Sequence, residues 1–292
     1  MAFLSYLLTG LGLGSVYAII ALGYTMVYGI AKMLNFAHGD VIMVGAYVAF
    51  FALTKFGLPS IVAVVLAVVV CTLLGVTIER LAYKPLRSAT SLSVLITAIG
   101  VSYFLQNSAQ LVWGTDTKMF PALGNGQFKL FGGQLSVSYL TLITILVCIV
   151  IMVCLTLFIN NTKTGKAMRA CSEDKGAAQL MGINVNTTIS ITFAIGSGLA
   201  AIAAFLLCAT YPAVSPTLGS LPGIKAFTAA VFGGIGSIPG ALLGGLILGI
   251  IETLTKAYIS TQLSDAIVFA VLIVVLLIKP AGLLGKKMSE KV

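Results

Sequence analysis

The sequence predicts an all-α protein, a polytopic membrane helix bundle with about eight to nine transmembrane segments, some of them broken or re-entrant. Hydrophobic residues make up 59% of the 292 residues, charged residues make up only 9%, and the mean hydropathy is +1.10. A soluble domain of this composition would lack the polar surface that keeps it dissolved. Apolar runs long enough to span a bilayer alternate with short polar segments. We therefore expect residues 1–292 to form a single transmembrane domain.

The charge pattern argues against nucleic acid as a partner and favours a lipid bilayer. The formal net charge is +9, but the basic residues are spread between apolar runs, without a dense basic arm or an aromatic stacking platform. Basic residues that flank membrane spans mark the cytoplasmic side. The five cysteines form no CxxC pair and four of them lie in apolar runs, so we interpret them as small core residues.

The longest polar interruption, residues 160–188, determines the predicted topology. It carries four Lys and Arg residues against Glu173 and Asp174, and an apolar run long enough to span a bilayer lies on each side. Each charge at the centre of a membrane helix costs about 2.5 to 3.5 kcal/mol, so this segment must lie in water. Its excess of positive charge places it in the cytoplasm. We expect spans at residues 137–159 and 189–211, directly before and after it.

The first apolar run, residues 3–31, is expected to be a span that packs closely on a neighbouring helix. Gly10, Gly14 and Ala18 recur at every fourth position, which places small residues on one face of the helix.

A polar segment with the sequence NFAHGD follows at residues 35–40. Asn and Gly interrupt a helix, and at membrane depth such a break would be functional. At the surface it would be only a tight turn. The run before it is already long enough to cross, so its length favours the turn at the cytoplasmic surface, although the sequence is compatible with both positions.

The middle of the chain is predicted to alternate between the two sides of the membrane. The run at residues 41–53 is short for a span, whereas the run at 61–78 has ordinary length, and basic residues around Pro85 mark a second cytoplasmic loop. The run at 92–113 carries a polar stripe that should face the bundle or a pathway rather than lipid. The polar, glycine-rich residues 114–133 suit an exterior loop. The polar stripe includes Ser93, Thr97 and Gln106.

Two short apolar runs, residues 224–235 and 241–254, are separated by a glycine-rich segment. Neither reaches the ~20 residues of a straight span. We interpret them either as broken or re-entrant helices or as two spans whose ends use flanking residues. Interrupted helices around a central site are typical of transporters. The glycines expected at breaks or packing faces are Gly233, Gly236, Gly240 and Gly244.

A last run at residues 266–278 completes the membrane part. Counting outward from the central polar segment gives eight or nine spans, and nine would place the N-terminus outside. The lysines that follow the last run place the C-terminus in the cytoplasm. These lysines are Lys279, Lys286, Lys287 and Lys291.

The chain offers little catalytic chemistry. It has only eight carboxylates, and it lacks a Walker A motif, an HExxH motif and any Cys/His cluster with metal-ligand spacing. Its single histidine, His38, has no Ser or Cys partner for a nucleophilic site. Asp40, Glu252 and Asp265 are the acids that could lie within the membrane, which is a poor supply for a proton relay. We therefore predict no catalytic residue and no metal site, and a chain that moves a solute with energy supplied elsewhere.

Four motifs resemble a known family. GLGSVYA at residues 12–18, GYTMVYG at 23–29 and NFAHGD at 35–40 closely resemble the first helix and following break of the LivH-type permeases of branched-chain amino-acid ABC importers. FGGIGSIPGA at residues 232–241 resembles their glycine-rich C-terminal signature, which sugar-importer permeases share more loosely. The resemblance runs through essentially all of the chain. It implies a permease subunit for leucine, isoleucine, valine or a similar amino acid.

The resemblance also implies a docking role for the central polar segment. GAAQLMG at residues 176–182 resembles the EAA-x-x-x-G coupling segment of ABC import permeases, a short cytoplasmic helix that docks in a cleft of the ATPase. Gly176 replaces the Glu of that motif, and Glu173 or Asp174 could take its place. A compact apolar helix that a glycine ends suits docking, although a solvated connector is the alternative. The coupling residues are expected to be Glu173, Asp174, Ala177, Ala178, Leu180 and Gly182.

The family further implies the rest of an importer in a bacterial inner membrane. The partners are a second, related permease subunit, two ATP-binding subunits that use ATP and Mg²⁺, and an extracytoplasmic substrate-binding protein. No cofactor is expected in this chain itself. ATP binding would close the ATPases, pull on the coupling segments and switch the pathway between outward- and inward-facing states. The candidate pathway residues are Asn35, His38, Asp40, Ser93, Thr97 and Gln106.

Two alternatives remain compatible with the sequence. A permease of the same superfamily for urea, sugars or other amino acids would share almost every feature named above. A stand-alone ion-coupled carrier belongs to a different class of transporter, and the scarcity of acids within the membrane runs argues against it. The partner permease could be either a different chain or a second copy of this one.

Overall fold

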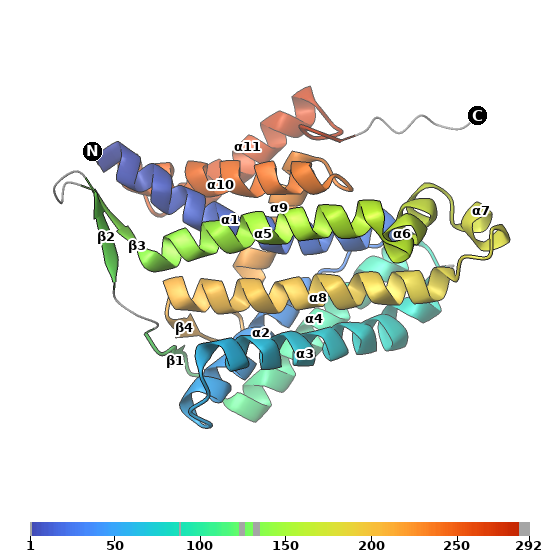
Figure 1. Ribbon diagram of the computed structural model, residues 1–292, viewed down its shortest axis with the longest axis horizontal. Coiled ribbons are helices and arrows are strands. Elements are labelled where there is room, and N and C mark those ends of the chain that lie inside the picture. The colour runs from blue at the N-terminus through green and yellow to red at the C-terminus, as the bar shows by residue number, and fades with distance from the viewer. Residues whose placement is uncertain (1, 88, 123–125, 131–134, 286–292) are drawn as a thin grey trace.

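A computed structural model describes residues 2–87, 89–122, 126–130 and 135–285, and these form a bundle of α-helices that run mostly along the long axis of the molecule (Figure 1). Within the described residues, six helices are long and apolar enough to cross a membrane. The all-α membrane bundle is therefore as predicted, whereas six such helices do not establish a count of eight or nine. The six are α1 (Ala2–Ala31), α3 (Ser60–Ile78, continued by short helical turns to Leu86), α4 (Ser91–Trp113), α5 (Tyr139–Asn161), α8 (Val185–Thr210) and α10 (Ile238–Tyr258).

Three further helices have 14 to 17 residues. They are α2 (His38–Thr54), α9 (Ser220–Gly233) and α11 (Ser264–Ile278). The second short apolar run of the sequence belongs to α10, a helix of 21 residues that also uses the residues on both sides of the run. The first short run lies in α9, which has only 14 residues, about 21 Å at 1.5 Å per residue.

Non-membrane structure gathers at the two ends of the bundle (Figure 1). At one end, here called the α7 end, lie α6 (Lys163–Glu173) and α7 (Lys175–Leu180), which form the central polar segment. At the other, the sheet end, short antiparallel pairs join β1 (Lys118–Met119) to β4 (Ala213–Val214) and β2 (Gln127–Leu130) to β3 (Leu135–Ser138). Residues 123–125 and 131–134 of the predicted exterior loop lie outside the described residues, as do Lys286, Lys287 and Lys291.

The core lies around α1 and α8. Within the most apolar stretch of 18 residues in each helix, 56% of the stretch in α1 and 67% of that in α8 is buried. The share is only 17 to 28% in α3, α4 and α5. The exposed side chains of α3 and α5 are almost all aliphatic, which suits contact with lipid. The peripheral helices therefore surround a protein-lined centre in which polar groups can be satisfied.

Small residues bring α1 and α10 into backbone contact. A Cβ atom added to Gly249 would lie 2.2 Å from the Cα atom of Gly14, and one added to Gly245 would lie 2.4 Å from the nitrogen of Ala18. The face of small residues on the first apolar run thus meets the glycines of α10. Without a hydrophobic driving force between helices in lipid, such close packing is a main source of helix association.

The polar segment at residues 35–40 lies inside the bundle. A Cβ atom on Gly23 of α1 would lie 2.6 Å from Nε2 of His38 and 3.2 Å from the carbonyl oxygen of Gly196 in α8. Both glycines lie well within their helices, so the break is buried between helices rather than exposed in a turn at the end of the bundle. The chain ends α1 at Ala31, returns through non-helical residues 32–37, and begins α2 at the level of the α1 interior.

The glycine-rich signature forms the contact between α9 and α10. A Cβ atom on Gly233 would lie 1.9 Å from the carbonyl oxygen of Gly240, and one on Gly244 would lie 2.1 Å from the carbonyl oxygen of Ala229. Gly236 lies in the turn between the helices with φ of +93°, a conformation that glycine adopts without strain. These glycines therefore allow the chain to reverse with almost no space between the two helices.

We expect Gly249→Ala to destabilise the protein, because the new methyl group would overlap the backbone of α1. Overpacking of this kind costs about 1 to 3 kcal/mol. Gly100→Ala in α4 is the matched control, since nothing lies within 4 Å of a Cβ atom at that position. Thermal unfolding of both variants in detergent checks this, and equal midpoints would contradict the tight α1–α10 contact.

Candidate functional site

A partly buried polar cluster joins α2, α4 and α9, and we call Asp40, Ser102, Gln106 and Ser220 the break cluster. Nε2 of Gln106 lies 2.8 Å from Oδ1 of Asp40, to which it donates. The same nitrogen lies 3.2 Å from Oγ of Ser102 and 3.4 Å from Oγ of Ser220. Asp40 is only 2% exposed. A carboxylate inside an apolar bundle requires such partners, because an unpaired buried charge is costly.

Asn35 and His38, the other polar residues of the break, are also buried. The hydroxyl of Tyr83 donates to Oδ1 of Asn35 at 2.9 Å. The imidazole of His38 packs on the ring of Tyr24, with centroids 4.6 Å apart. Within the described part of the chain, Nε2 of His38 has no hydrogen-bond partner.

The structure brings together only some of the six candidate pathway residues. Asp40 and Gln106 are in direct contact, and Asn35 and His38 lie in the same break. Ser93 is instead at the start of α4, where its backbone N–H donates to Oγ1 of Thr90 at 3.3 Å and helps to cap the helix. Thr97 lies one turn further along α4 and is half-buried.

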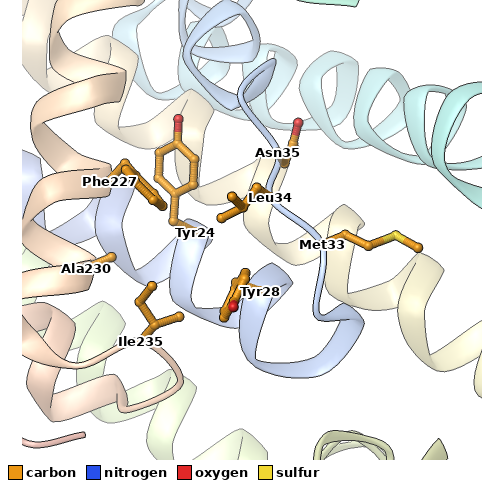
Figure 2. A pocket seen from close by; sticks show the side chains of 8 residues that line it. All are labelled: Tyr24, Tyr28, Met33, Leu34, Asn35, Phe227, Ala230 and Ile235. Atoms are coloured by element: carbon orange, nitrogen blue, oxygen red, sulfur yellow. The ribbon is translucent and has the colours of Figure 1, made fainter. Parts of the chain in front are cut away.

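A small pocket lies beside the break (Figure 2). Its walls come from α1, the non-helical segment that follows α1, α9 and the turn after α9. The cavity volume is about 10 Å³, which is the space of about one water molecule. In this conformation the pocket cannot hold an amino acid. The lining residues are Tyr24, Tyr28, Met33, Leu34, Asn35, Phe227, Ala230 and Ile235.

A second buried cluster, the ion network, joins α9 to α1, α10 and α11. Nζ of Lys225 lies 2.9 Å from Oε1 of Glu252 and 2.6 Å from Oδ1 of Asp265. Glu252 also accepts from Nζ of Lys256 at 2.5 Å and from the hydroxyl of Tyr17 at 2.9 Å. The side chains of Lys225 and Glu252 are 7% and 1% exposed, so their charges are stabilised by each other rather than by water.

Sequence reasoning singled out Glu252 and Asp265 but missed Lys225. The available signal was a lysine inside an otherwise apolar run, because such a residue requires an acidic partner. The partners lie on helices that follow later in the chain, so local periodicity could not identify them.

A third buried acid lies toward the α7 end. Glu79 is fully buried and forms an ion pair with Arg87, not with the adjacent Arg80. Oγ of Ser190 donates to Oε2 of Glu79 at 2.6 Å, and Arg87 also donates to the side chain of Asn186. This set ties the end of the α3 segment to the first turns of α8.

Well-defined caps hold the short helix α7 in place. Oδ1 of Asp174 accepts hydrogen bonds from the backbone N–H groups of Gly176 and Ala177 at 2.8 and 3.0 Å. Gly182 has φ of +81°, and the N–H of Ile183 donates to the carbonyl oxygen of Ala178 at 3.0 Å, which closes the C-terminus. The side chain of Asp174 therefore supplies a carboxylate at the start of this helix, where the motif has its Glu at the position of Gly176.

The tip of the central segment is apolar and exposed. Leu180 is 89% exposed and Met181 is 83% exposed, whereas Ala178 is buried beneath them. Glu173 and Ala177 are exposed as well. Met181 was not among the expected coupling residues. We call Leu180 and Met181 the apolar tip.

No group of three or more His, Cys, Asp or Glu side chains that could hold a metal ion occurs among the described residues. The buried polar clusters can hold helices and contact a polar solute. They contain no paired nucleophile and base.

Long apolar helices, an interrupted interior and an exposed loop define a multi-pass membrane permease. Residues 6–276 match the family model described as "Branched-chain amino acid transport system / permease component". The chain belongs to this family of permease components.

Relatives of nearly the same length share close to half of the sequence. The chain is 47% identical to the high-affinity branched-chain amino acid transport system permease protein BraD of Pseudomonas aeruginosa, over 99% of this chain and 98% of the relative. The values are the same for LivH of Escherichia coli K12, which carries the same description.

A solved structure supports the fold. PsaBC from Streptococcus pneumoniae in complex with Fab contains a chain that matches with a TM-score of 0.50 at 14% identity. The match covers 96% of this chain and 93% of that one.

We expect Lys225→Met to destabilise the bundle, because it leaves the buried carboxylate of Glu252 short of one partner and Asp265 unpaired. Breaking a buried ion pair from one side costs about 3 kcal/mol, which corresponds to a loss of roughly 5–10 °C in the thermal midpoint. Lys256→Met removes the other lysine of Glu252, which is 36% exposed and on the same helix, and should cost less than about 1 kcal/mol. Thermal unfolding in detergent compares the two, and an equal loss would show that burial of Lys225 has no special role.

Proposed function

We propose that this chain is a permease subunit of an ABC importer for branched-chain amino acids. Family membership over residues 6–276 and the apolar tip on α7 support this proposal. Family membership is the observation that carries it, and the apolar tip supports the expected partner contact. An exposed Leu–Met pair on a capped, water-exposed helix has no role in folding, and it suits a hydrophobic cleft on another protein.

The break cluster and the pocket are proposed to belong to the pathway. The break cluster lies between α2, α4 and α9, and the pocket lies between α1, residues 33–35 and α9. Together they combine amide, carboxylate and hydroxyl groups with aromatic side chains. A branched-chain amino acid needs both kinds of contact, because it has a charged end and an apolar end. The closed pocket is consistent with a resting state of alternating access.

The exposed face of α4 is proposed to meet a second, related permease subunit. This helix has the lowest mean hydropathy of the six candidate spans in the described residues, 1.3, and is also the least buried, at 17%. Its exposed face carries large apolar side chains, among them Ile96, Phe104 and Leu111, interrupted by Gly100 and Asn107. A broad apolar face with a small residue in it suits close packing of a partner helix.

We propose that two ATP-binding subunits, which would hold ATP and Mg²⁺, supply the energy. An extracytoplasmic binding protein would deliver the solute. This chain would then need no cofactor of its own. It would act by changing shape when the ATPases move the apolar tip.

The proposed topology has nine passages of the chain through a bacterial inner membrane, with α2 and α9 as short ones. The positive charge of residues 160–188 supports a cytoplasmic α7 end. The sheet end would then be outside, together with the start of α1. The end of α11 and the C-terminus would be cytoplasmic.

Leu180→Asp should abolish binding of the ATP-binding subunits without loss of membrane insertion. The carboxylate would be desolvated in an apolar cleft, at a cost of about 2 kcal/mol or more, so co-purification should fall at least about tenfold. Phe56→Asp is the matched control, because Phe56 is 71% exposed in the α2–α3 connection at the sheet end. Equal co-purification of both variants would argue for a solvated connector.

The proposed function is tested in proteoliposomes. The chain with its partner subunits and binding protein should accumulate labelled leucine, isoleucine or valine only with ATP inside the compartment that holds the ATPases. The chain alone should be inactive. Uptake by the lone chain along an ion gradient would establish a carrier instead, and ATP-driven uptake of urea or a sugar in preference to leucine would establish a different solute.

A further inference from the structure

One lysine of the central segment reaches back into the bundle. Nζ of Lys175, the first residue of α7, donates to the carbonyl oxygen of Ala31, the last residue of α1, at 2.7 Å. Lys163, Lys166 and Arg169 on α6 are exposed instead. Lys175 therefore stands apart from the basic residues that only mark the cytoplasmic side.

The contact provides a hydrogen-bond donor for a carbonyl group at the C-terminus of α1. The last four carbonyl groups of a helix have no partner within the helix, and the C-terminus carries a partial negative charge that a cation stabilises. The last turn of α1 contains no basic residue. Lys175 acts as a cap that comes from a distant part of the chain.

The ammonium group of Lys175 is partly buried, and other positive charges lie near it. Burial, with the nearby charges of Arg87 and Lys32, lowers the pKa of Lys175 from its usual value. Lys32 has φ of +57°, which a residue other than glycine adopts at an energetic cost, so the chain reverses sharply directly after Ala31. Lys175 holds the helix end at the point where this reversal begins.

The segment after the reversal leads directly to the break. Met33, Leu34 and Asn35 line the pocket, and α2 starts at His38. The contact of Lys175 therefore lies between two features. One is the apolar tip, which begins at Leu180, five residues further along the chain, and the other is the first interruption of the bundle. A shift of α7 would move the Ala31 carbonyl and, through it, residues 32–37.

We propose that Lys175 is a positioning residue that couples movement of α7 to the break at residues 35–40 through the end of α1. This inference depends on the proposed function, because it assumes that α7 receives movement from an ATPase. It goes beyond docking, since Lys175 points away from the apolar tip and into the bundle.

Three variants test the proposal in the assembled importer: Lys175→Met removes charge and donor, Lys175→Arg retains both, and Lys166→Met is the control on exposed α6. Co-purification, ATP hydrolysis and leucine uptake are measured on the same proteoliposomes. We expect Lys175→Met to keep assembly and ATP hydrolysis, while the number of ATP molecules hydrolysed per leucine rises about tenfold, as for a lost coupling energy of ordinary size. Lys175→Arg and Lys166→Met should keep the wild-type ratio.

Three results would overturn the proposal. They are an unchanged ratio in Lys175→Met, an equal fall of hydrolysis and uptake, and loss of ATPase association, which would assign Lys175 to docking. If Lys175→Met does not reach the membrane, Lys175→Gln replaces it, and the same ratio decides. Absence of ATP-dependent uptake in the wild-type assembly would instead refute the proposed function, so the two failures are distinguishable.

Discussion

Backbone groups in an apolar bundle must find their hydrogen bonds within the protein, and this constraint explains why the interruptions of this chain lie together. A Cβ atom on Gly219, at the start of α9, would lie 1.7 Å from the carbonyl oxygen of Gly39 in the first break. At its other end, the carbonyl groups of Phe232 and Gly233 accept hydrogen bonds from the N–H groups of Leu283 and Leu284. The start of α9 thus lies against the first break, and its end is held by the residues that follow α11.

The buried charges obey the same constraint, and the break cluster and the ion network both involve α9. Ser220 near its start belongs to the break cluster, Lys225 belongs to the ion network, and Phe227 lines the pocket. A helix of 14 residues is too short to be held by lipid matching alone. These polar contacts, together with the glycine contacts to α10, hold it in place.

The helical bundle and its close contacts could be predicted because their signals are local. Runs of apolar residues give the spans, and spacing by four gives the face of small residues that carries Gly10 and Gly14. The position of the break could not be predicted by length, because α1 ends at Ala31 while the chain folds back beside it. The pairing of Lys225 with Glu252 and Asp265, and of Glu79 with Arg87, could not be predicted either. These partners come together only when the helices pack, and local sequence patterns do not describe that packing.

The start of α7 shows how the structure replaces a motif residue. In the family pattern a Glu occupies the position of Gly176, yet a carboxylate at that site is not needed to begin the helix, because Asp174 already accepts from two backbone N–H groups. Lys175 between them is free to turn inward to α1. The exposed surface of this segment then combines the apolar tip with the charged side chains of Glu173 and Asp174 beside it, so the proposed contact with a partner would join buried apolar area to charge.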